Sequence, residues 1–419
     1  MEHLFQHLAS IVGLIIVICF SYQAVYVVIG LIKKPKKYHT ENKHRYAVVI
    51  SARNESMVIG NLIASIQSQT YDSELVDTIV VADNCTDDTA KIAREAGAIV
   101  YERFNHQRVG KGYALEYLFH RVEEDYGIEA YDGYFIIDAD NILEEDYIEH
   151  MNAVFDNGYR VVTSYRNSKN LSSNWISFGY ALWFLREARF VNNVRMMLGV
   201  SCAVSGTGFL VSSEIIKKNN GWKHFLLTED IEFSVDNMLH GEKIGYCGDA
   251  VFYDEQPETF SASWHQRMRW SRGFYQVFFK YGRQLVARCI KKRDFSCYDM
   301  LITLVPGIGL TVITSIFSVL SLYFGMFHLK MAVVICLKSV LGSLLSSYVT
   351  LFLLGVITAI SEHKRIHCKG WKVFLYLFTF PIFMFTYIPI SVVAMFYTPE
   401  WKPIVHSVSV TRKEIHESN

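Results

Sequence analysis

Long runs of apolar residues lie toward the two ends of the chain. Residues 8–32 contain no formally charged side chain and are long enough to cross the roughly 30 Å hydrocarbon core of a bilayer as one helix. Three further apolar runs occupy residues 300–329, 339–361 and 373–399. The pattern predicts a transmembrane anchor over residues 1–37, transmembrane helices over residues 300–399 and a tail over residues 400–419.

Basic residues beside two of these runs predict the orientation of the chain. Lys33, Lys34, Lys36 and Lys37 follow the first run, and Lys364, Arg365, Lys369 and Lys372 lie between the last two. Because positive charge is enriched in cytoplasmic loops, we expect a multi-pass protein of the cell membrane with a cytoplasmic middle region. A cleaved signal peptide fits less well, because the first apolar run is too long and its lysines follow it.

The last apolar run contains Pro381 and Pro389. Proline breaks a helix, and a bilayer tolerates broken backbone only where protein covers it. This run is therefore either a kinked crossing or a re-entrant hairpin, and the two alternatives place the tail on opposite sides of the membrane.

Residues 38–255 alternate short apolar runs with amphipathic stretches. The runs at residues 46–50, 78–81, 98–101 and 133–137 have the length of strands, and the intervening stretches have helical spacing. Such alternation predicts an α/β domain whose mostly parallel sheet is covered by helices on both faces. Ligands of these sheets bind beyond the carboxyl ends of the strands, where three of the runs end in polar residues. We therefore expect one cleft at that edge.

Three acidic residues follow apolar runs and are candidates for binding. Asp138 and Asp140 come directly after the run at residues 133–137, and a hard divalent cation would relieve their repulsion while binding nucleotide phosphates. The alternative is that this pair caps the next helix. Asp83 ends another run, where it either accepts hydrogen bonds from a base or ribose or simply forms a turn.

Further candidates lie elsewhere in the middle region. Lys111 either neutralises a diphosphate or is a solvated lysine at a helix start. Asp230 precedes an apolar helical stretch, so it is either a helix-capping acid or a general base for an acceptor hydroxyl. Residues 264–273 are dense in tryptophan and arginine. They suit both an amphipathic interfacial helix, predicted over residues 256–299, and a site for sugar and diphosphate.

Composition excludes several classes of function. The 41 basic residues equal the 41 acidic residues, so no positive surplus points to a nucleic-acid partner. The eight cysteines include no CxxC pair, which argues against a zinc site of the usual spacing. A hydrophobic content of 51% fits a membrane protein that also carries a folded polar domain.

The motifs, taken in order, resemble glycosyltransferase family 2, in the membrane-bound branch that holds cellulose, hyaluronan and poly-N-acetylglucosamine synthases. They occupy residues 48–55, 83–89, 110–112, 138–140, 206–209, 228–230 and 266–270. The family's usual Pro-Thr-Tyr-Asn-Glu loop is replaced here by Ser51-Ala52-Arg53-Asn54-Glu55. The resemblance implies a GT-A-like nucleotide-sugar-binding domain over residues 38–255, with transmembrane α-helices at both ends.

The resemblance also implies a role for each matching residue. The nucleotide would be bound by Ala52, Arg53, Glu55, Asp83, Lys111 and Asp138. Asp140, together with Asp138, would hold Mg2+ or Mn2+ on the diphosphate, and Asp230 would be the catalytic base. The diphosphate and the acceptor would contact Gly206, Thr207, Gly208, Glu229, Gln266, Arg269 and Trp270.

The implied activity is transfer of a hexosyl or N-acetylhexosaminyl group from a UDP-sugar to a growing polysaccharide, with inversion to a β-linkage. Transfer of a single sugar to a lipid is the alternative. A transporter or receptor with a soluble domain is less favoured, because it has no use for the paired carboxylates or for Asp230. The motifs leave open whether an export or assembly partner is required in the membrane.

Overall fold

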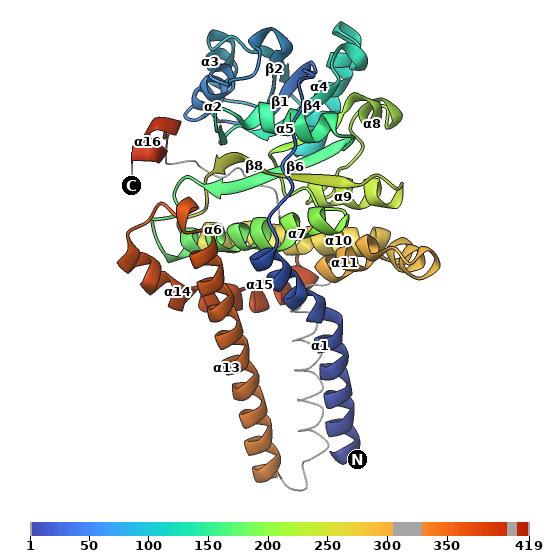
Figure 1. Ribbon diagram of the computed structural model, residues 1–419, viewed down its shortest axis with the longest axis vertical. Coiled ribbons are helices and arrows are strands. Elements are labelled where there is room, and N and C mark those ends of the chain that lie inside the picture. Colours follow the sequence, from blue (N-terminus) through green and yellow to red (C-terminus); the bar gives the residue numbers. More distant parts are fainter. Residues whose placement is uncertain (1, 305–328, 400–408, 418–419) are drawn as a thin grey trace.

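An α/β domain and two long projecting helices make up the described part of the chain. The computed structural model describes residues 2–304, 329–399 and 409–417. Helices α1 (Glu2–Ile32) and α13 (Leu329–Ser361) extend in the same direction from the base of the domain (Figure 1). The predicted apolar runs at residues 8–32 and 339–361 are therefore helical.

One eight-stranded sheet forms the centre of the domain, in the order β3-β2-β1-β4-β7-β6-β8-β5. The strands are β1 (Tyr46–Ala52), β2 (Val76–Asp83), β3 (Ile99–Arg103), β4 (Gly133–Asp138), β5 (Ile142–Leu143), β6 (Val161–Ser168), β7 (Phe209–Ser212) and β8 (Ile244–Asp254). Strands β1 to β4 pair in parallel, as do β6 and β8, whereas β7 is antiparallel to both β4 and β6. The mixed, mostly parallel sheet is confirmed, and the four predicted strands fall within β1 to β4 except at residue 98, which precedes β3.

Apolar cores lie on both faces of this sheet, which explains why its strands are continuously apolar. Ala47 and Val49 of β1 belong to one core, and Val48 and Ile50 belong to the other. The first core includes residues of α4 (Lys111–Asp125), α8 (Ser213–Lys218) and α9 (Glu229–Leu239). The second includes residues of α2 (Ile59–Gln67), α3 (Thr89–Glu95) and α5 (Tyr147–Asp156).

A layer of helices forms the base of the domain, below the sheet in Figure 1. It contains α6 (Trp175–Glu187), α7 (Asn193–Leu198), α10 (Phe260–Lys292), α11 (Phe295–Leu304), α14 (Gly370–Phe385) and α15 (Tyr387–Phe396). Arg267 of α10 is fully buried, and its Nη1 donates to Thr386 Oγ1 at 2.7 Å and to the Phe383 carbonyl at 3.2 Å. The guanidinium thus satisfies backbone and hydroxyl groups where α14 ends and α15 begins.

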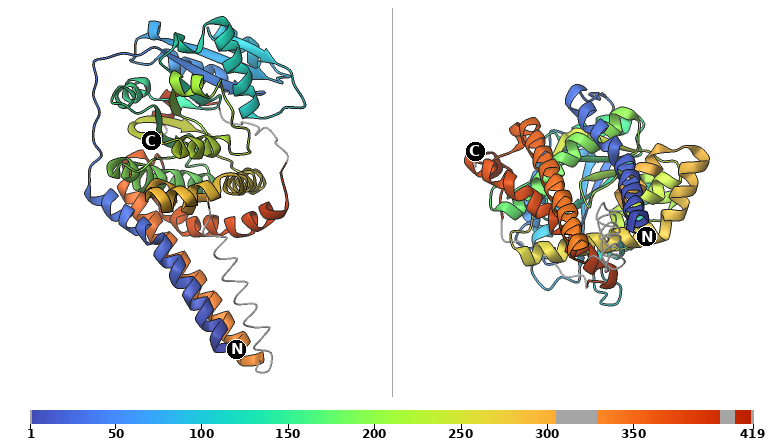
Figure 2. Two further views of the ribbon diagram at one scale, coloured as in Figure 1. Left: turned by 90° about the vertical axis from the view of Figure 1, so that its right-hand side faces the viewer. Right: turned by 90° about the horizontal axis from the view of Figure 1, so that it is seen from below.

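Two described helical stretches, Leu341–Ser361 and Gly370–Phe396, are long and apolar enough to cross a membrane. The second contains the break at Thr386, and its two halves lie across the base rather than along α13 (Figures 1 and 2). In α1 the described apolar stretch, Val17–Ile32, is shorter. The predicted run at residues 300–329 lies mostly outside the described residues. Transmembrane helices at both ends of the chain therefore stay a prediction.

The end of the chain returns to the α/β domain. Helix α16 (Arg412–Glu417) lies against it, with Ile415 buried and Arg412 in an ion pair with Glu145. Asn61 of α2 donates to Ser409 Oγ at 2.9 Å. The described end of the tail, residues 409–417, thus packs against the α/β domain, and the side of the membrane on which it lies stays a prediction.

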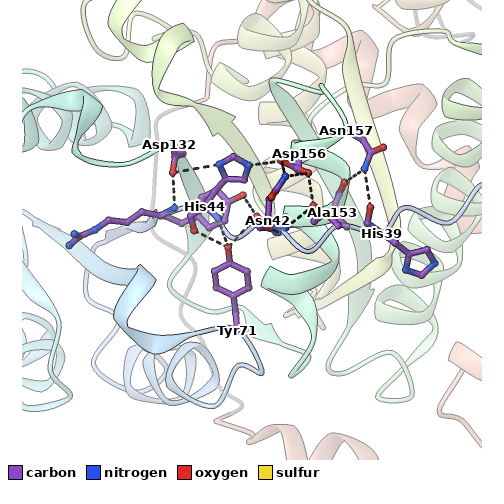
Figure 3. A network of polar contacts seen from close by, with 12 residues as sticks. His39, Asn42, His44, Tyr71, Asp132, Ala153, Asp156 and Asn157 are labelled. Atoms are coloured by element: carbon purple, nitrogen blue, oxygen red, sulfur yellow. Dashed lines mark hydrogen bonds and ion pairs between the residues drawn. The ribbon is translucent and has the colours of Figure 1, made fainter.

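A polar network anchors the segment that joins α1 to the sheet (Figure 3). The Asp156 carboxylate accepts from Thr40 Oγ1 at 2.5 Å and lies 2.9 Å from His44 Nε2. Asn152 donates to the Asn42 carbonyl at 2.8 Å. Residues 33–45 form no helix or strand, and these contacts fasten them to α5 through two side chains and one backbone carbonyl.

Candidate active site

A cavity of about 1200 Å3 lies at the carboxyl ends of β1, β2, β4 and β8. It is lined by most of the predicted site residues: Arg53, Glu55, Asp83, Lys111, Asp138, Asp140, Gly206, Thr207, Glu229, Asp230, Gln266, Arg269 and Trp270. The fold thus brings together segments that are far apart in the sequence, at the edge of the sheet where a ligand was expected.

Ala52 and Gly208 are the predicted site residues that do not line this cavity. Ala52 is 1% exposed and packs in the core between the sheet and α2. Gly208 has a φ of +69°, and a Cβ there would lie 2.2 Å from Cε1 of Phe252. The structure gives both positions a role in packing instead of the predicted ligand contacts.

Asp83 lies at the end of β2 and is held in place by Arg103 at the end of β3. Arg103 Nη1 donates to Asp83 Oδ1 at 2.5 Å, and Asn84 Nδ2 donates to the same oxygen at 3.1 Å. Both bonds go to Oδ1, so Oδ2 is the atom of this carboxylate that can accept from a ligand in the cavity.

Lys111 begins α4 and forms an ion pair with Asp138, at the end of β4. Its Nζ also donates to the Gly206 carbonyl at 2.8 Å. Burial lowers the pKa of Lys111, but Asp138 and Glu229 raise it above its usual value, so the ammonium stays charged. Lys111 therefore ties β4 to the Gly206 turn in addition to facing the cavity.

Asp140 is the acidic residue best placed to bind a metal ion in this cavity. Its Oδ1 accepts from Asn141 Nδ2 at 3.0 Å and its Oδ2 from the Glu255 backbone at 3.4 Å, and neither is an ion pair. Within the described ranges, no three His, Cys, Asp or Glu side chains form a metal-binding group. This donor set fits a Mg2+-like ion that takes one or two carboxylates and completes its shell with phosphate oxygens and water.

Asp230 stands in the first turn of α9, and a backbone turn holds its carboxylate. The Gly206 N–H donates to Asp230 Oδ2 at 2.6 Å. Gly206 has a φ of +80°, a conformation that residues other than glycine rarely adopt. The glycine of the predicted motif is thus required to aim an N–H at Asp230.

The neighbouring acids Glu229 and Asp230 have different environments. Burial raises the pKa of Glu229 to about 7, and the charge of Asp230 adds to this rise. Burial also raises the pKa of Asp230, while hydrogen bonds from the Ile231 and Gly206 backbone lower it. Asp230, with its anion held by N–H groups, is therefore the acid of the pair that loses its proton first.

The raised pKa of Glu229 predicts how stability changes with pH. Between about 4.5 and about 7, the folded protein keeps this proton while the unfolded chain releases it, so rising pH destabilises the fold. Glu229→Gln cannot titrate, and we expect its thermal stability to fall less than that of the wild type between pH 4.5 and pH 8. Melting curves at both pH values measure the change in melting temperature of each protein. Equal changes in the two proteins would contradict the raised pKa of Glu229.

Gln266, Arg269 and Trp270 lie on α10, which passes close to the start of α9. A Cβ on Gly273 would lie 2.4 Å from Thr228 Cγ2, so glycine permits this approach. Gln266 Oε1 and Arg269 Nε are buried and have no hydrogen-bond partner among the described residues. Buried polar atoms are rarely left unpaired, so two of them at one cavity indicate a polar ligand.

Sequence reasoning missed two groups of charged residues that line the cavity. Arg166 and Asp254 form an ion pair, and burial raises the pKa of Asp254 to about 6. Each lies at or near the end of an apolar strand, the same signal that identified Asp83 and Asp138. The second group is Arg186, Glu187, Arg195 and Asp299. These residues lie on helices, and no local pattern marks them.

Residues 44–273 match the family model described as glycosyltransferase like family 2. The probable glycosyltransferase YdaM of Bacillus subtilis is 24% identical over 275 residues, 62% of this chain and 62% of that protein. A beta-monoglucosyldiacylglycerol synthase of Synechocystis is 25% identical over 268 residues, 62% of this chain and 54% of that protein.

A poly-beta-1,6-N-acetyl-D-glucosamine synthase of Staphylococcus aureus is 24% identical over 260 residues, 59% of this chain and 58% of that protein. The chain thus spans 54–62% of the length of these three relatives. Among solved structures, a mannosyltransferase of Pyrobaculum calidifontis, in complex with GDP-Man and Mn2+, is similar with a TM-score of 0.57 and 14% identity. The match covers 92% of this chain and 99% of that one, and it supports the GT-A-like fold.

Proposed function

The chain belongs to the glycosyltransferase-like family 2, and from this we propose that it is a membrane enzyme that transfers a sugar from a UDP-sugar to a growing polysaccharide. The transfer inverts the anomeric centre and forms a β-linkage. The observation that carries the proposal is the cavity in which the Asp230 carboxylate, Asp140 and the unpaired Gln266 and Arg269 atoms meet. This set combines a base, a candidate metal ligand and donors for a diphosphate.

Asp230 removes the proton from the acceptor hydroxyl as its oxygen attacks the anomeric carbon. The new bond joins that oxygen to the sugar, and the bond between the sugar and the UDP phosphate breaks. Arg269 faces the departing diphosphate, and such preorganised charge contributes strongly to catalysis. Asp83 and the loop with Arg53 and Glu55 receive the nucleoside.

A Mg2+ or Mn2+ ion, held by Asp140 near Asp138, would neutralise charge on the leaving diphosphate. Asp138 itself is engaged by Lys111 through Oδ1 and by Thr207, whose Oγ1 lies 2.7 Å from the Asp138 backbone nitrogen. Asp140 would therefore be the principal ligand on the protein side, and Asp138 would contribute its remaining oxygen.

Removing the Asp140 carboxylate should uncouple nucleotide binding from the metal. In Asp140→Ala we expect UDP affinity to be the same with and without Mn2+, whereas the wild type binds UDP more tightly when Mn2+ is present. Calorimetric titration with and without the ion measures both. Glu255→Ala, which removes another carboxylate at the cavity, is the matched control and should keep the metal effect. A metal effect retained in Asp140→Ala would contradict the assignment.

The protein is proposed to lie in the cell membrane as a multi-pass protein with a cytoplasmic active site. Helices α1 and α13 leave the base of the domain in one direction, and Lys33, Lys34, Lys36 and Lys37 stand between α1 and the domain. This arrangement suits a domain that rests on the inner surface of the bilayer, with these lysines close to the lipid headgroups.

Transfer of a single sugar to a lipid is a second candidate, because one relative is named a beta-monoglucosyldiacylglycerol synthase. Membranes that contain the protein, incubated with a panel of radiolabelled UDP-sugars, test both candidates. A ladder of products supports the polysaccharide synthase, and one product that extracts with lipids supports the glycolipid synthase. If no UDP-sugar is consumed under any metal condition, the proposed function is wrong.

A further inference from the structure

The cavity does not end at Asp230 but continues into the base of the domain. Its lining there includes Gln23 of α1, Trp183, Arg186 and Glu187 of α6, and Ser347 of α13. Residues of α1 and α13, the two helices that project from the base of the domain (Figure 2), thus contribute to the lining of this lower part. An acceptor must approach Asp230 from somewhere other than the nucleotide side, and this part of the cavity supplies the space.

Glu187 is the acidic side chain of the lower cavity that has no partner. Its carboxylate makes no hydrogen bond or ion pair with any residue in the ranges 2–304, 329–399 and 409–417. Burial raises the pKa of Glu187, and the nearby Arg195, Arg186 and Arg166 counteract this rise. An unpaired carboxylate in a partly desolvated cavity is costly, which indicates that hydroxyl groups of a ligand or water solvate it.

Two of the three arginines near Glu187 are ion-paired with other carboxylates. Arg195 binds Asp299 through two bonds of 2.8 Å, and Arg166 is paired with Asp254. Arg186 donates to Gln23 Oε1 at 3.1 Å and lies 4.7 Å from the Trp183 ring centre, whereas its Nε is buried without a hydrogen-bond partner among the described residues.

The three arginines of the lower cavity are balanced in number by three carboxylates, Asp299, Asp254 and Glu187, of which Asp299 and Asp254 form ion pairs with Arg195 and Arg166. No surplus positive charge is left for a phosphate, and an anionic acceptor would meet the Glu187 carboxylate. Trp183 and Trp270 add flat apolar surfaces, which suit the face of a sugar ring or the start of an apolar chain.

The spacing of Trp183 and Glu187 along α6 places both side chains on the same side of the cavity. Trp183 and Glu187 are four residues apart and share a helix face. Directly after Glu187 the helix widens into one π-helical turn, Ala188–Asn192. Such turns shift the register of a helix and often occur at functional sites, and here Val191 reaches the same cavity.

We propose that Glu187 accepts hydrogen bonds from an uncharged, hydroxyl-bearing acceptor and thereby orients it toward Asp230. The inference rests on the proposed glycosyl transfer and names its acceptor class. Two sources share this chemistry: the terminal sugar of a glycan chain and the glycerol end of a neutral lipid. Glu187 acts as a positioning residue for the acceptor, and lipid phosphates are disfavoured at this site.

The test compares three acceptors with the full-length protein in lipid nanodiscs: a short β-linked oligosaccharide, diacylglycerol and a polyprenyl phosphate. Transfer is followed with the UDP-sugar that the wild type consumes. We expect the wild type to use the oligosaccharide or the diacylglycerol and to use the polyprenyl phosphate poorly. Preference for the polyprenyl phosphate would overturn the proposal.

Glu187→Gln keeps the size of the side chain and removes its charge. We expect its KM for the uncharged acceptor to rise roughly 10- to 100-fold, because a hydrogen bond to a charged group is lost. The KM for the UDP-sugar and the slow release of UDP without acceptor should stay as in the wild type. Glu187→Asp, which keeps the negative charge on a side chain one methylene shorter, should show a smaller rise in the KM for the acceptor. Glu214→Gln, on the surface of α8, is the control and should change nothing.

These readouts separate the two proposals. If the wild type releases no UDP from any UDP-sugar, the proposed function itself fails. If it does, an unchanged acceptor KM in Glu187→Gln overturns the role of Glu187. Loss of acceptor-independent UDP release in the same variant would also overturn it, because the residue would then support the fold or the donor site.

Discussion

Asp230→Asn is expected to lower sugar transfer by about 100- to 10,000-fold, the usual contribution of a general base. The asparagine side chain has the same shape, and its oxygen can accept the Gly206 N–H that holds Asp230 at 2.6 Å. The amide cannot accept the proton of the acceptor hydroxyl. Turnover measured by UDP release should therefore collapse while the geometry of the site persists.

A measurement of UDP binding shows whether the variant loses the proton-transfer step or loses its affinity for the nucleotide. We expect the affinity of Asp230→Asn for UDP to match the wild type in calorimetric titration, because Asp83 and Asp140 are untouched. Asp249→Asn, at an exposed position of β8, is the matched control and should retain full activity. Turnover close to that of the wild type in Asp230→Asn would show that Asp230 is not the catalytic base.

Asp299→Asn is expected to lower the free energy of unfolding by about 3–5 kcal/mol, as is typical when one partner of a buried ion pair is removed. Asp299 and Arg195 are 2% and 3% exposed. The same carboxylate accepts from Tyr22 OH at 2.8 Å and Tyr26 OH at 2.9 Å, so it joins α11 and α7 to α1. Asparagine leaves the Arg195 guanidinium buried without a counter-charge.

A double variant separates two contributions to the free energy of unfolding: the penalty for leaving one buried charge unpaired and the net stabilisation by the ion pair. Arg195→Met with Asp299→Asn removes both charges, and we expect it to be more stable than Asp299→Asn alone. Thermal unfolding in one detergent, with all variants measured together, gives the comparison. A single variant within about 1 kcal/mol of the wild type would show that solvent reaches this cluster.

Local sequence predicted four of the eight strands and one rim of the site. The apolar runs that became β1 to β4 needed no tertiary information, because a strand buried on both faces is apolar at every position. Asp83 and Asp138 end such strands, and parallel strands bring their carboxyl ends to one edge. Position along the chain therefore implied their proximity in space.

The same reasoning did not predict how the charges pair. Lys111 binds Asp138, 27 residues away, and Arg195 binds Asp299, 104 residues away. Which charges meet depends on how α4, α7 and α11 pack. The local sequence around a lysine or an aspartate on a helix does not predict its ion-pair partner. Glu187 went unnoticed for this reason, since only the surrounding helices place it in the cavity.

By itself, then, the sequence determined the alternation of strands and helices, the order of the motifs and the apolar runs at both ends. The tertiary structure decided that Gly208 packs against Phe252, that α14 and α15 lie across the base, and that the tail returns to the domain. Periodicity is a property of neighbouring residues, so a single sequence records it directly. Contacts between distant segments are set by the packing of whole elements, which no short stretch of sequence contains.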